Sequence, residues 1–164
     1  LRLGDRISIM HHGRIVQTGA TQDIVLHPAD DYVAEFVRHM NPLTVLTGAM
    51  IMRKREQMDR AEGGLCLDDG RRYQLNLDAH HALVELRLDG QPHPWLVVGD
   101  DAVCAENERA VVVAPSSLSL QSLIHLRQTT GHPVLLAEGG QVLGVCGETE
   151  IICALAARGS ASSA

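Results

Sequence analysis

The sequence is poor in aromatic residues, with one Trp, two Tyr and one Phe in 164 residues. A core must therefore be built mainly from Leu, Val, Ile, Met and Ala, which a hydrophobic content of 45% allows. No apolar run approaches the roughly 18 residues that a membrane-spanning helix needs. No basic segment followed by an apolar one resembles a signal peptide at the start. We therefore expect no direct insertion into a membrane.

An excess of positive charge is also missing. The net charge is −6, which argues against non-specific binding to nucleic acid. The four cysteines form no C-x-x-C pair and are expected to be reduced thiols that pack as small apolar residues. The nine histidines include the adjacent pairs His11-His12 and His80-His81, and none has zinc-site spacing. We predict no metal site and no nucleic-acid partner.

The sequence lacks the G-x-x-x-x-G-K-[ST] loop that cradles nucleotide phosphates. It also lacks an apolar strand ending in acidic residues that could hold Mg²⁺. We therefore predict that this chain has no catalytic residues and no cofactor of its own, and does not hydrolyse ATP by itself. The first residues, LRLGD, carry no initiator Met, so we expect the chain to be part of a longer protein.

The N-terminal stretch predicts a hairpin followed by two helices. Two apolar-rich runs, Arg6–Met10 and Arg14–Gln17, flank a His-His-Gly turn. Thr21 is predicted to cap a short helix, and a second helix should begin near Asp30. That helix is expected to bury one face, made of Tyr32, Val33, Phe36 and Val37. The unit is too small for a core of its own, so the stripe of Tyr32, Phe36 and Val37 should be covered by a further domain or dock a partner subunit.

Beyond a charged stretch that ends in two glycines, the middle of the chain predicts strands. Alternating apolar and polar residues indicate half-buried strands, and a purely apolar run indicates a buried one. These runs are Arg72–Leu77, Ala82–Leu88, Pro94–Val98 and Ala110–Ala114. The acidic stretch Asp100–Arg109 is expected to be a loop.

The last third predicts a helix, two strands and a second helix. Ser119 can cap the first helix, and Gly131 stands where a C-terminal glycine would end it. The remaining predicted elements are strands over Pro133–Ala137 and Gln141–Cys146, a turn over Glu138–Gly140, and a helix over Glu148–Ala157 with Ile151, Ile152 and Leu155 facing inward. Residues 159–164 are predicted to be disordered.

The segment LRLGDRISIMHHGRIVQTGATQDIVLHP resembles the C-terminal end of the catalytic domain in ATP-binding subunits of ABC transporters. The extension DDYVAEFVRHMNPLTVL resembles the ATPases of quaternary-amine importers, those for glycine betaine, proline betaine and choline, and its MNPL element favours the choline type. The resemblance implies a parent subunit that hydrolyses ATP with Mg²⁺ and binds a transmembrane permease. It also implies a peripheral location at the cytoplasmic face of the inner membrane.

The segment LSLQSLIHLRQTTGHPVLLAEGGQVLGVCGETEIICAL, Leu118 to Leu155, resembles one CBS motif. CBS motifs pair, so the stretch from about Gly48 should hold a divergent partner motif. The expected fold is α+β, a CBS-like domain with a mixed sheet and flanking helices behind a remnant of an ABC ATPase domain. The expected boundaries are 1–47 for the remnant with its connecting helix, 48–158 for the CBS-like domain with its second motif at 118–155, and 159–164 for the tail.

The CBS resemblance implies one binding site. Adenosine-binding motifs close the second strand with Gly-Val-(Val/Ile)-Thr-x-x-Asp, whose hydroxyl and carboxylate hold ribose and phosphate. Here Gly147 stands at the Thr position and Glu150 at the Asp position, so we predict a degraded adenosine site. Glu138 and Glu148 add negative charge, and only Arg127 is near in sequence to oppose it.

These resemblances imply the regulatory C-terminal region of an ATPase subunit from a choline or glycine betaine importer. We expect it to modulate activity and to dimerise, and not to be catalytic by itself. The helix faces expected to form the homodimer contact are Leu120, Leu123 and Ile124, and Ile151, Ile152 and Leu155. The alternative is a stand-alone CBS-type sensor that binds adenine nucleotides.

Overall fold

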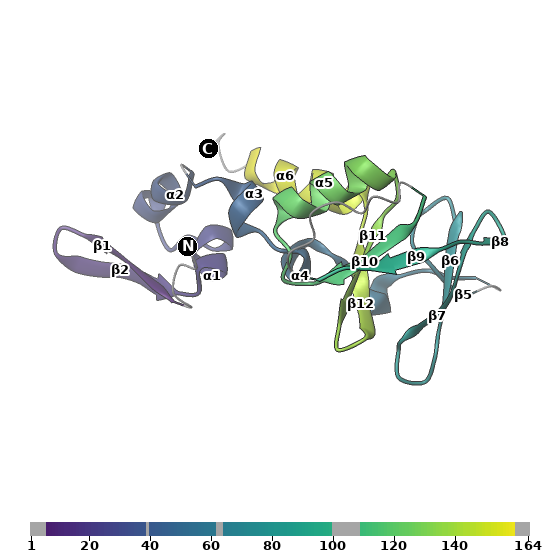
Figure 1. Ribbon diagram of the computed structural model, residues 1–164. Helices are drawn as coiled ribbons and strands as arrows, with labels where there is room; N and C mark the ends of the chain where they lie inside the picture. The colour runs from purple at the N-terminus through teal and green to yellow at the C-terminus, as the bar shows by residue number, and fades with distance from the viewer. Residues whose placement is uncertain (1–5, 39, 62–63, 100–108, 160–164) are drawn as a thin grey trace. The chain divides into compact units, whose positions relative to one another are not determined.

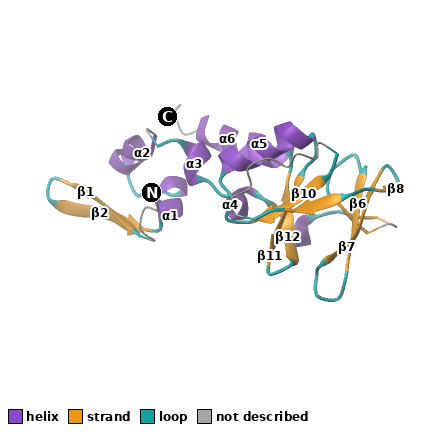
Figure 2. Cartoon of the chain, in the orientation of Figure 1, coloured by secondary structure: helices purple, strands orange, loops and turns teal. Residues whose placement is uncertain are grey.

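A computed structural model describes residues 6–38, 40–61, 64–99 and 109–159 (Figure 1). The chain divides into a first unit, Leu1–Leu46, and a second unit, Thr47–Ala164, next to the boundary that the sequence predicts. Both units contain helices and strands, so the chain is α+β (Figure 2). In the described ranges, no helix is long and apolar enough to cross a membrane.

The first unit begins with an antiparallel hairpin. Strand β1 (Ile7–His11) pairs with β2 (Arg14–Gly19), and His12 and Gly13 adopt positive φ in the turn between them. Three helices follow, α1 (Thr21–Leu26), α2 (Asp31–Arg38) and α3 (Pro42–Val45). A small core of Ile9, Ile24, Val25, Val33 and Val37 holds the hairpin and helices together. The predicted hairpin-helix-helix order is therefore present, with α3 added.

The helix starts in this unit differ by one residue from the prediction. Thr21 is the first residue of α1, not its cap, and Ala20 holds the cap position without a side-chain hydrogen bond. In α2 the cap is Asp30, whose Oδ1 accepts a hydrogen bond from the Val33 amide at 2.9 Å.

The predicted apolar face of α2 is only half buried. Val33 and Val37 lie in the core, but Tyr32 is 38% and Phe36 48% exposed. The Tyr32 ring stacks on His11, with ring centroids 3.8 Å apart, which leaves its other face open. Tyr32 and Phe36 are thus outside the core of this unit, and their cover by a further domain or a partner subunit stays a prediction.

A five-stranded mixed sheet forms the centre of the second unit. Its order is β3 (Arg53–Lys54), β12 (Gln141–Cys146), β11 (Val134–Glu138), β10 (Val111–Pro115) and β9 (Trp95–Val97). Strand β10 runs parallel to β9 and β11, whereas β12 runs antiparallel to β11 and β3. We call these five strands the mixed sheet.

Helices cover one face of the mixed sheet. The helices α4 (Gly48–Ile51), α5 (Leu120–Thr130) and α6 (Glu148–Gly159) lie on the same side (Figure 1). The buried side chains between sheet and helices are Val112, Ala114, Leu118, Leu123, Leu126, Val134, Leu136 and Cys146. Gly48 allows α4 to pack closely, because a Cβ there would lie 2.7 Å from Leu136 Cδ1 and 3.1 Å from the Ser116 carbonyl oxygen, and the Leu136 side chain would have to shift.

A second, antiparallel sheet covers the other face. After the 3₁₀ turn η1 (Arg55–Gln57), its strands are β4 (Arg60–Ala61), β5 (Gly64–Cys66), β6 (Tyr73–Leu77), β7 (Leu83–Leu88) and β8 (Gln91–Pro92), each paired with the next. The core between the two sheets comprises Met58, Leu67, Tyr73, Leu75, Leu86, Val111, Val113, Leu135, Val142 and Val145. The second unit therefore has three layers, namely helices, mixed sheet and antiparallel sheet.

The antiparallel sheet occupies the stretch where the sequence predicts a divergent partner motif. The described residues from 48 to 99 contain no helix-strand-strand-helix unit and no helix longer than four residues. The alternating strands and the turn at Asp89 and Gly90, both at positive φ, favour adjacent hairpins over helices here. Residues 100–108 of the expected loop at 100–109 and residues 160–164 of the expected tail at 159–164 lie outside the described residues, whereas Gly159, predicted to be in the tail, is the last residue of the C-terminal helix Glu148–Gly159.

The predicted order over Leu118–Leu155 is present as α5, β11, β12 and α6. Ser119 caps α5, with its Oγ accepting a hydrogen bond from the Ser122 amide at 3.2 Å. Gly131 ends the helix at φ 71°. Gly139 and Gly140 adopt positive φ in the hairpin turn, as glycine readily does.

Two predictions about helix faces were wrong. Ile151 packs on the helix-side core, but Ile152 is 55% and Leu155 41% exposed. Leu120 and Leu123 of α5 are fully buried and cannot contact another molecule. Of the predicted homodimer surface, the partly buried Ile124 of α5 and the exposed part of α6 remain.

Candidate functional site

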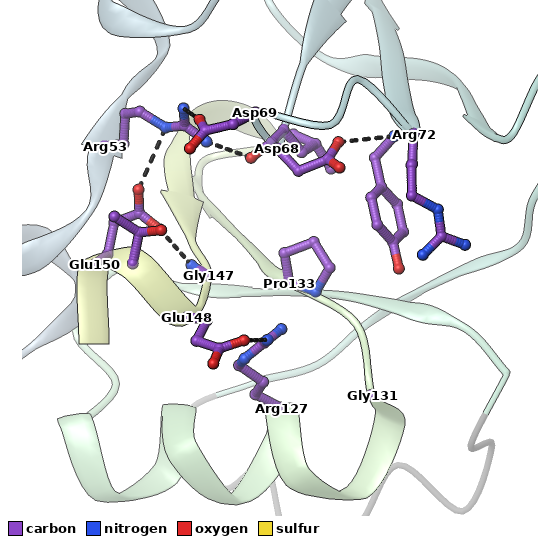
Figure 3. A pocket seen from close by; sticks show the side chains of 13 residues that line it. Arg53, Asp68, Asp69, Arg72, Arg127, Gly131, Pro133, Gly147, Glu148 and Glu150 are labelled. Atoms are coloured by element: carbon purple, nitrogen blue, oxygen red, sulfur yellow. Dashed lines mark hydrogen bonds and ion pairs between the residues drawn. The ribbon is translucent and has the colours of Figure 1, made fainter. Parts of the chain in front are cut away.

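A pocket of about 250 Å³ lies where α5, α6 and the antiparallel sheet meet (Figure 3). Gly147 and Glu150, the two residues of the predicted adenosine site, both line it. The other lining residues are Arg53, Leu67, Asp68, Asp69, Arg72, Tyr73, Arg127, Gly131, Pro133, Glu148 and Thr149. The two residues singled out from the sequence therefore do border a pocket, whatever its ligand.

Glu150 is engaged by the protein itself. Its Oε2 accepts a hydrogen bond from the Gly147 amide at 2.8 Å, and its Oε1 lies 3.3 Å from Arg53 Nε. Only 10% of its side chain is exposed. The first contact is the reach of a carboxylate in the first helical turn back to the amide before the helix, and it fixes the start of α6. Both oxygens are thus occupied before any ribose arrives.

Arg53 connects three parts of the second unit. It belongs to β3, pairs with Glu150 of α6, and donates through Nη2 to the Leu67 carbonyl after β5. Its Nη1 lies 3.3 Å from Asp69 Oδ1. Nε is buried, and its contact with Glu150 is an ion pair without hydrogen-bond geometry. Because one guanidinium serves all these partners, it ties the two sheets and α6 together at the pocket wall.

Two further arginines border the pocket, each with a carboxylate partner. Arg127 of α5 donates to Glu148 of α6 at 2.8 Å. Arg72 makes a two-point contact with Asp89, Nε to Oδ1 at 3.0 Å and Nη2 to Oδ2 at 2.8 Å. The hydrogen bond from Arg72 holds the pKa of Asp89 below its ordinary value, so this pair stays charged in moderately acidic solution.

Arg53 and Arg72 were not predicted from the sequence, which indicated Arg127 as the only basic residue near the site. No local pattern signals them, because Arg53 reaches the pocket through β3 and Arg72 through the antiparallel sheet. Their charges are balanced, since the lining also contains Asp68, Asp69, Glu148 and Glu150. A phosphate would have to displace existing ion pairs to bind here.

The absence of a side chain at Gly147 leaves room for the Glu150 carboxylate. A Cβ at position 147 would lie 3.1 Å from Glu150 Oε2, closer than side chains ordinarily approach. A threonine at this position would therefore require Glu150 to move. Gly147, which lacks the hydroxyl, and Glu150, which has the longer side chain, therefore act together. The Glu150 carboxylate accepts the hydrogen bond of the Gly147 amide at the start of α6.

The described ranges contain no cluster that could hold a metal ion, and of their free thiols only that of Cys153 on α6 is exposed. There, no three His, Cys, Asp or Glu side chains are grouped so as to hold a metal ion. Cys66 and Cys146 are buried, and burial raises the pKa of the Cys146 thiol to about 12. That thiol is not a nucleophile at neutral pH. Cys104 lies outside the described residues.

Comparison with known proteins places the chain beside transport ATP-binding proteins. It is 31% identical over 130 residues to the glycine betaine transport ATP-binding protein OpuAA of Bacillus subtilis, covering 79% of this chain and 28% of the relative. It is 27% identical over 161 residues to the glycine betaine/carnitine transport ATP-binding protein GbuA of Listeria monocytogenes, covering 94% and 41%. The choline transport ATP-binding protein OpuBA of Bacillus subtilis is 49% identical over 37 residues, 23% of this chain and 10% of the relative.

The chain thus spans well under half the length of these relatives. No family model matches it, and no solved structure matches it. The relatives are the kind of subunit that the sequence predicts, an ATP-binding component for betaine or choline transport. Their names say nothing of a CBS domain, of regulation or of dimers.

Nucleotide titration tests this interpretation of the pocket. We expect AMP, ADP and ATP to bind the chain more weakly than about 50 μM in calorimetry, because losing a hydroxyl contact to a charged group costs roughly 1.5–3 kcal/mol, or ten- to hundred-fold in affinity. The double substitution Gly147→Thr with Glu150→Asp should tighten binding, since it restores the hydroxyl and shortens the carboxylate.

The prediction would be contradicted if two results were obtained together. One is binding by the unaltered chain tighter than that limit, and the other is its loss in Glu150→Ala. Glu56→Ala is the matched control, because Glu56 is an exposed carboxylate paired with Arg55 outside the pocket.

Proposed function

We propose that this chain is the C-terminal regulatory part of the ATP-binding subunit of a quaternary-amine importer of the ABC type. The supporting observation is the extent of similarity to the Listeria monocytogenes relative, which covers 94% of the chain. A match of that extent includes both the first unit and the second. It favours one continuous subunit over an unrelated domain joined by chance to a short remnant.

The first unit would complete the catalytic domain of the parent subunit. Its hairpin and helices have a core of few side chains, and Tyr32 and Phe36 are left half exposed on α2. We take the preceding catalytic domain to cover them. ATP and Mg²⁺ would then bind elsewhere in the parent, and this chain would supply no catalytic residue.

The second unit would be a CBS-like regulatory domain built around one motif. The order β10, α5, β11, β12 and α6, with α4 and β3 ahead of it, supports this assignment. The antiparallel sheet is then an insertion between β3 and β9 of the mixed sheet. Because its pocket is satisfied internally, we assign the domain a conformation-relaying role and not that of a tight nucleotide sensor.

The partners of the parent would be a transmembrane permease and a second copy of the same subunit. The permease would hold the parent at the cytoplasmic face of the inner membrane. The cargo class is a quaternary amine such as glycine betaine or choline, as in the names of the relatives. The alternative, a stand-alone sensor of adenine nucleotides, is disfavoured by the internal use of Glu150 and Arg53.

Transport tests the proposal directly. We expect the complete subunit, expressed with its permease in cells that lack betaine and choline uptake, to restore uptake of labelled choline or glycine betaine. Replacing the phosphate-loop lysine of the parent should abolish uptake, since that side chain holds the nucleotide phosphates. A reading frame with no phosphate-binding loop upstream of this chain would disprove the proposal, and putrescine serves as the control cargo.

A second copy is expected to contact α6. Ile152 and Leu155 are exposed there, and a two-fold contact would bury both from each copy. Sedimentation at tens of micromolar should show a dimer for the chain and a monomer for Ile152→Glu with Leu155→Glu, because buried carboxylates would oppose association. Val84→Glu, exposed on β7, is the control and should stay dimeric. A monomer for the unaltered chain would count against this contact.

A further inference from the structure

Three side chains form a titratable cluster between the two sheets of the second unit. The hydroxyl of Tyr73 on β6 lies 2.7 Å from His132 Nδ1, in a hydrogen bond. The His132 ring meets the His93 ring edge to face, with centroids 4.9 Å apart. His132 directly precedes the Pro133 that leads into β11, and His93 directly follows β8. The cluster therefore joins the antiparallel sheet to the mixed sheet.

The segment that carries His93 is the crossover between the sheets. The His93 amide donates to the Leu86 carbonyl of β7 at 2.8 Å, and the next residue, Pro94, accepts from the Val111 amide of β10 at 3.1 Å. A change at His93 thus acts on both sheets. Nε2 of His93 is buried and has no hydrogen-bond partner in the described part of the chain.

The surroundings of His132 favour a neutral ring. Burial lowers the pKa of His132, with further lowering from His93, Arg72 and Arg127. The two arginines are held by Asp89 and Glu148, so their positive charges are partly balanced and stay in place. A second proton on His132 would place a partly buried positive charge against the His93 ring and near the guanidinium groups of Arg72 and Arg127.

We propose that the Tyr73–His132–His93 cluster is a pH-dependent clamp that holds the antiparallel sheet on the mixed sheet. With His132 neutral, its hydrogen bond with the Tyr73 hydroxyl joins the antiparallel sheet to the start of β11. Protonation charges the interface between the two sheets and loosens it. Tyr73 also lines the pocket, as do Gly131 and Pro133 on either side of His132, so loosening the clamp changes the pocket wall.

The pH range follows from the sign of the shift. Because the folded chain binds a proton less readily at His132 than the unfolded chain does, stability rises with pH in that range. The contribution is present above the ordinary pKa of histidine and is lost as pH falls toward the lowered value. Asp89 remains ionised there, since its own pKa is lowered.

The test follows unfolding of the full chain in urea at about pH 7.5 and about pH 5.5, either side of the ordinary titration range of histidine. Trp95, the one tryptophan in the sequence, begins β9 two residues after His93 and reports on the crossover by fluorescence. We expect the unaltered chain to unfold at a lower urea concentration at about pH 5.5 than at about pH 7.5. In the double variant His93→Gln with His132→Gln, the difference in urea midpoint between the two pH values should be at most half of that in the unaltered chain.

The control is His125→Gln, which removes an exposed histidine from α5 and should keep the whole pH dependence. An equal fall in the double variant and the unaltered chain would overturn the proposal. Should the double variant not fold, the proton resonances of His132 in the unaltered chain decide. Titration of that ring below the ordinary pKa of histidine supports the clamp, and titration at or above it refutes the clamp.

Discussion

The architecture of the second unit depends on burying both faces of the mixed sheet. Residues Val111 to Ala114 of β10 are all buried, with Val111 and Val113 facing the antiparallel sheet and Val112 and Ala114 facing the helices. A strand this apolar cannot leave either face in water, because each exposed Å² of apolar surface costs about 25 cal/mol. The antiparallel sheet therefore covers a face that would otherwise need another partner. The pocket lies where these layers meet.

Local signals in the sequence predicted much of this fold. The Ser119 cap, the Gly131 stop and the Gly139-Gly140 turn each act within a few residues, so they can be recognised without the rest of the chain. Inward and outward faces were harder to assign on short helices. Ile152 and Leu155 have the spacing of a core face, yet α6 rests on the sheet through Ile151 and leaves them exposed.

The candidate site was predicted only in part, because only some of its residues are signalled by local sequence. Gly147 and Glu150 belong to one local turn and were found from the motif. Arg53 and Arg72 arrive from β3 and from the antiparallel sheet, and their roles depend on pairings that no sequence spacing encodes. The pairing of Glu150 with Arg53 and with the Gly147 amide could likewise not be predicted from the sequence, although it decides what the pocket can bind. Local chemistry located the pocket, and long-range packing determined its electrostatics.

We propose that this chain is a regulatory extension of a transport ATPase. ATP hydrolysis by the reconstituted importer, measured over a range of pH, tests this central claim most directly. The comparison is between the complete parent subunit and a variant that ends before Thr47. Hydrolysis at about pH 7.5 should stay within about twofold, whereas the part of its pH dependence that the second unit confers should be lost. Loss of ATP hydrolysis in the shortened variant, or a pH dependence of hydrolysis equal to that of the complete subunit, would contradict the claim.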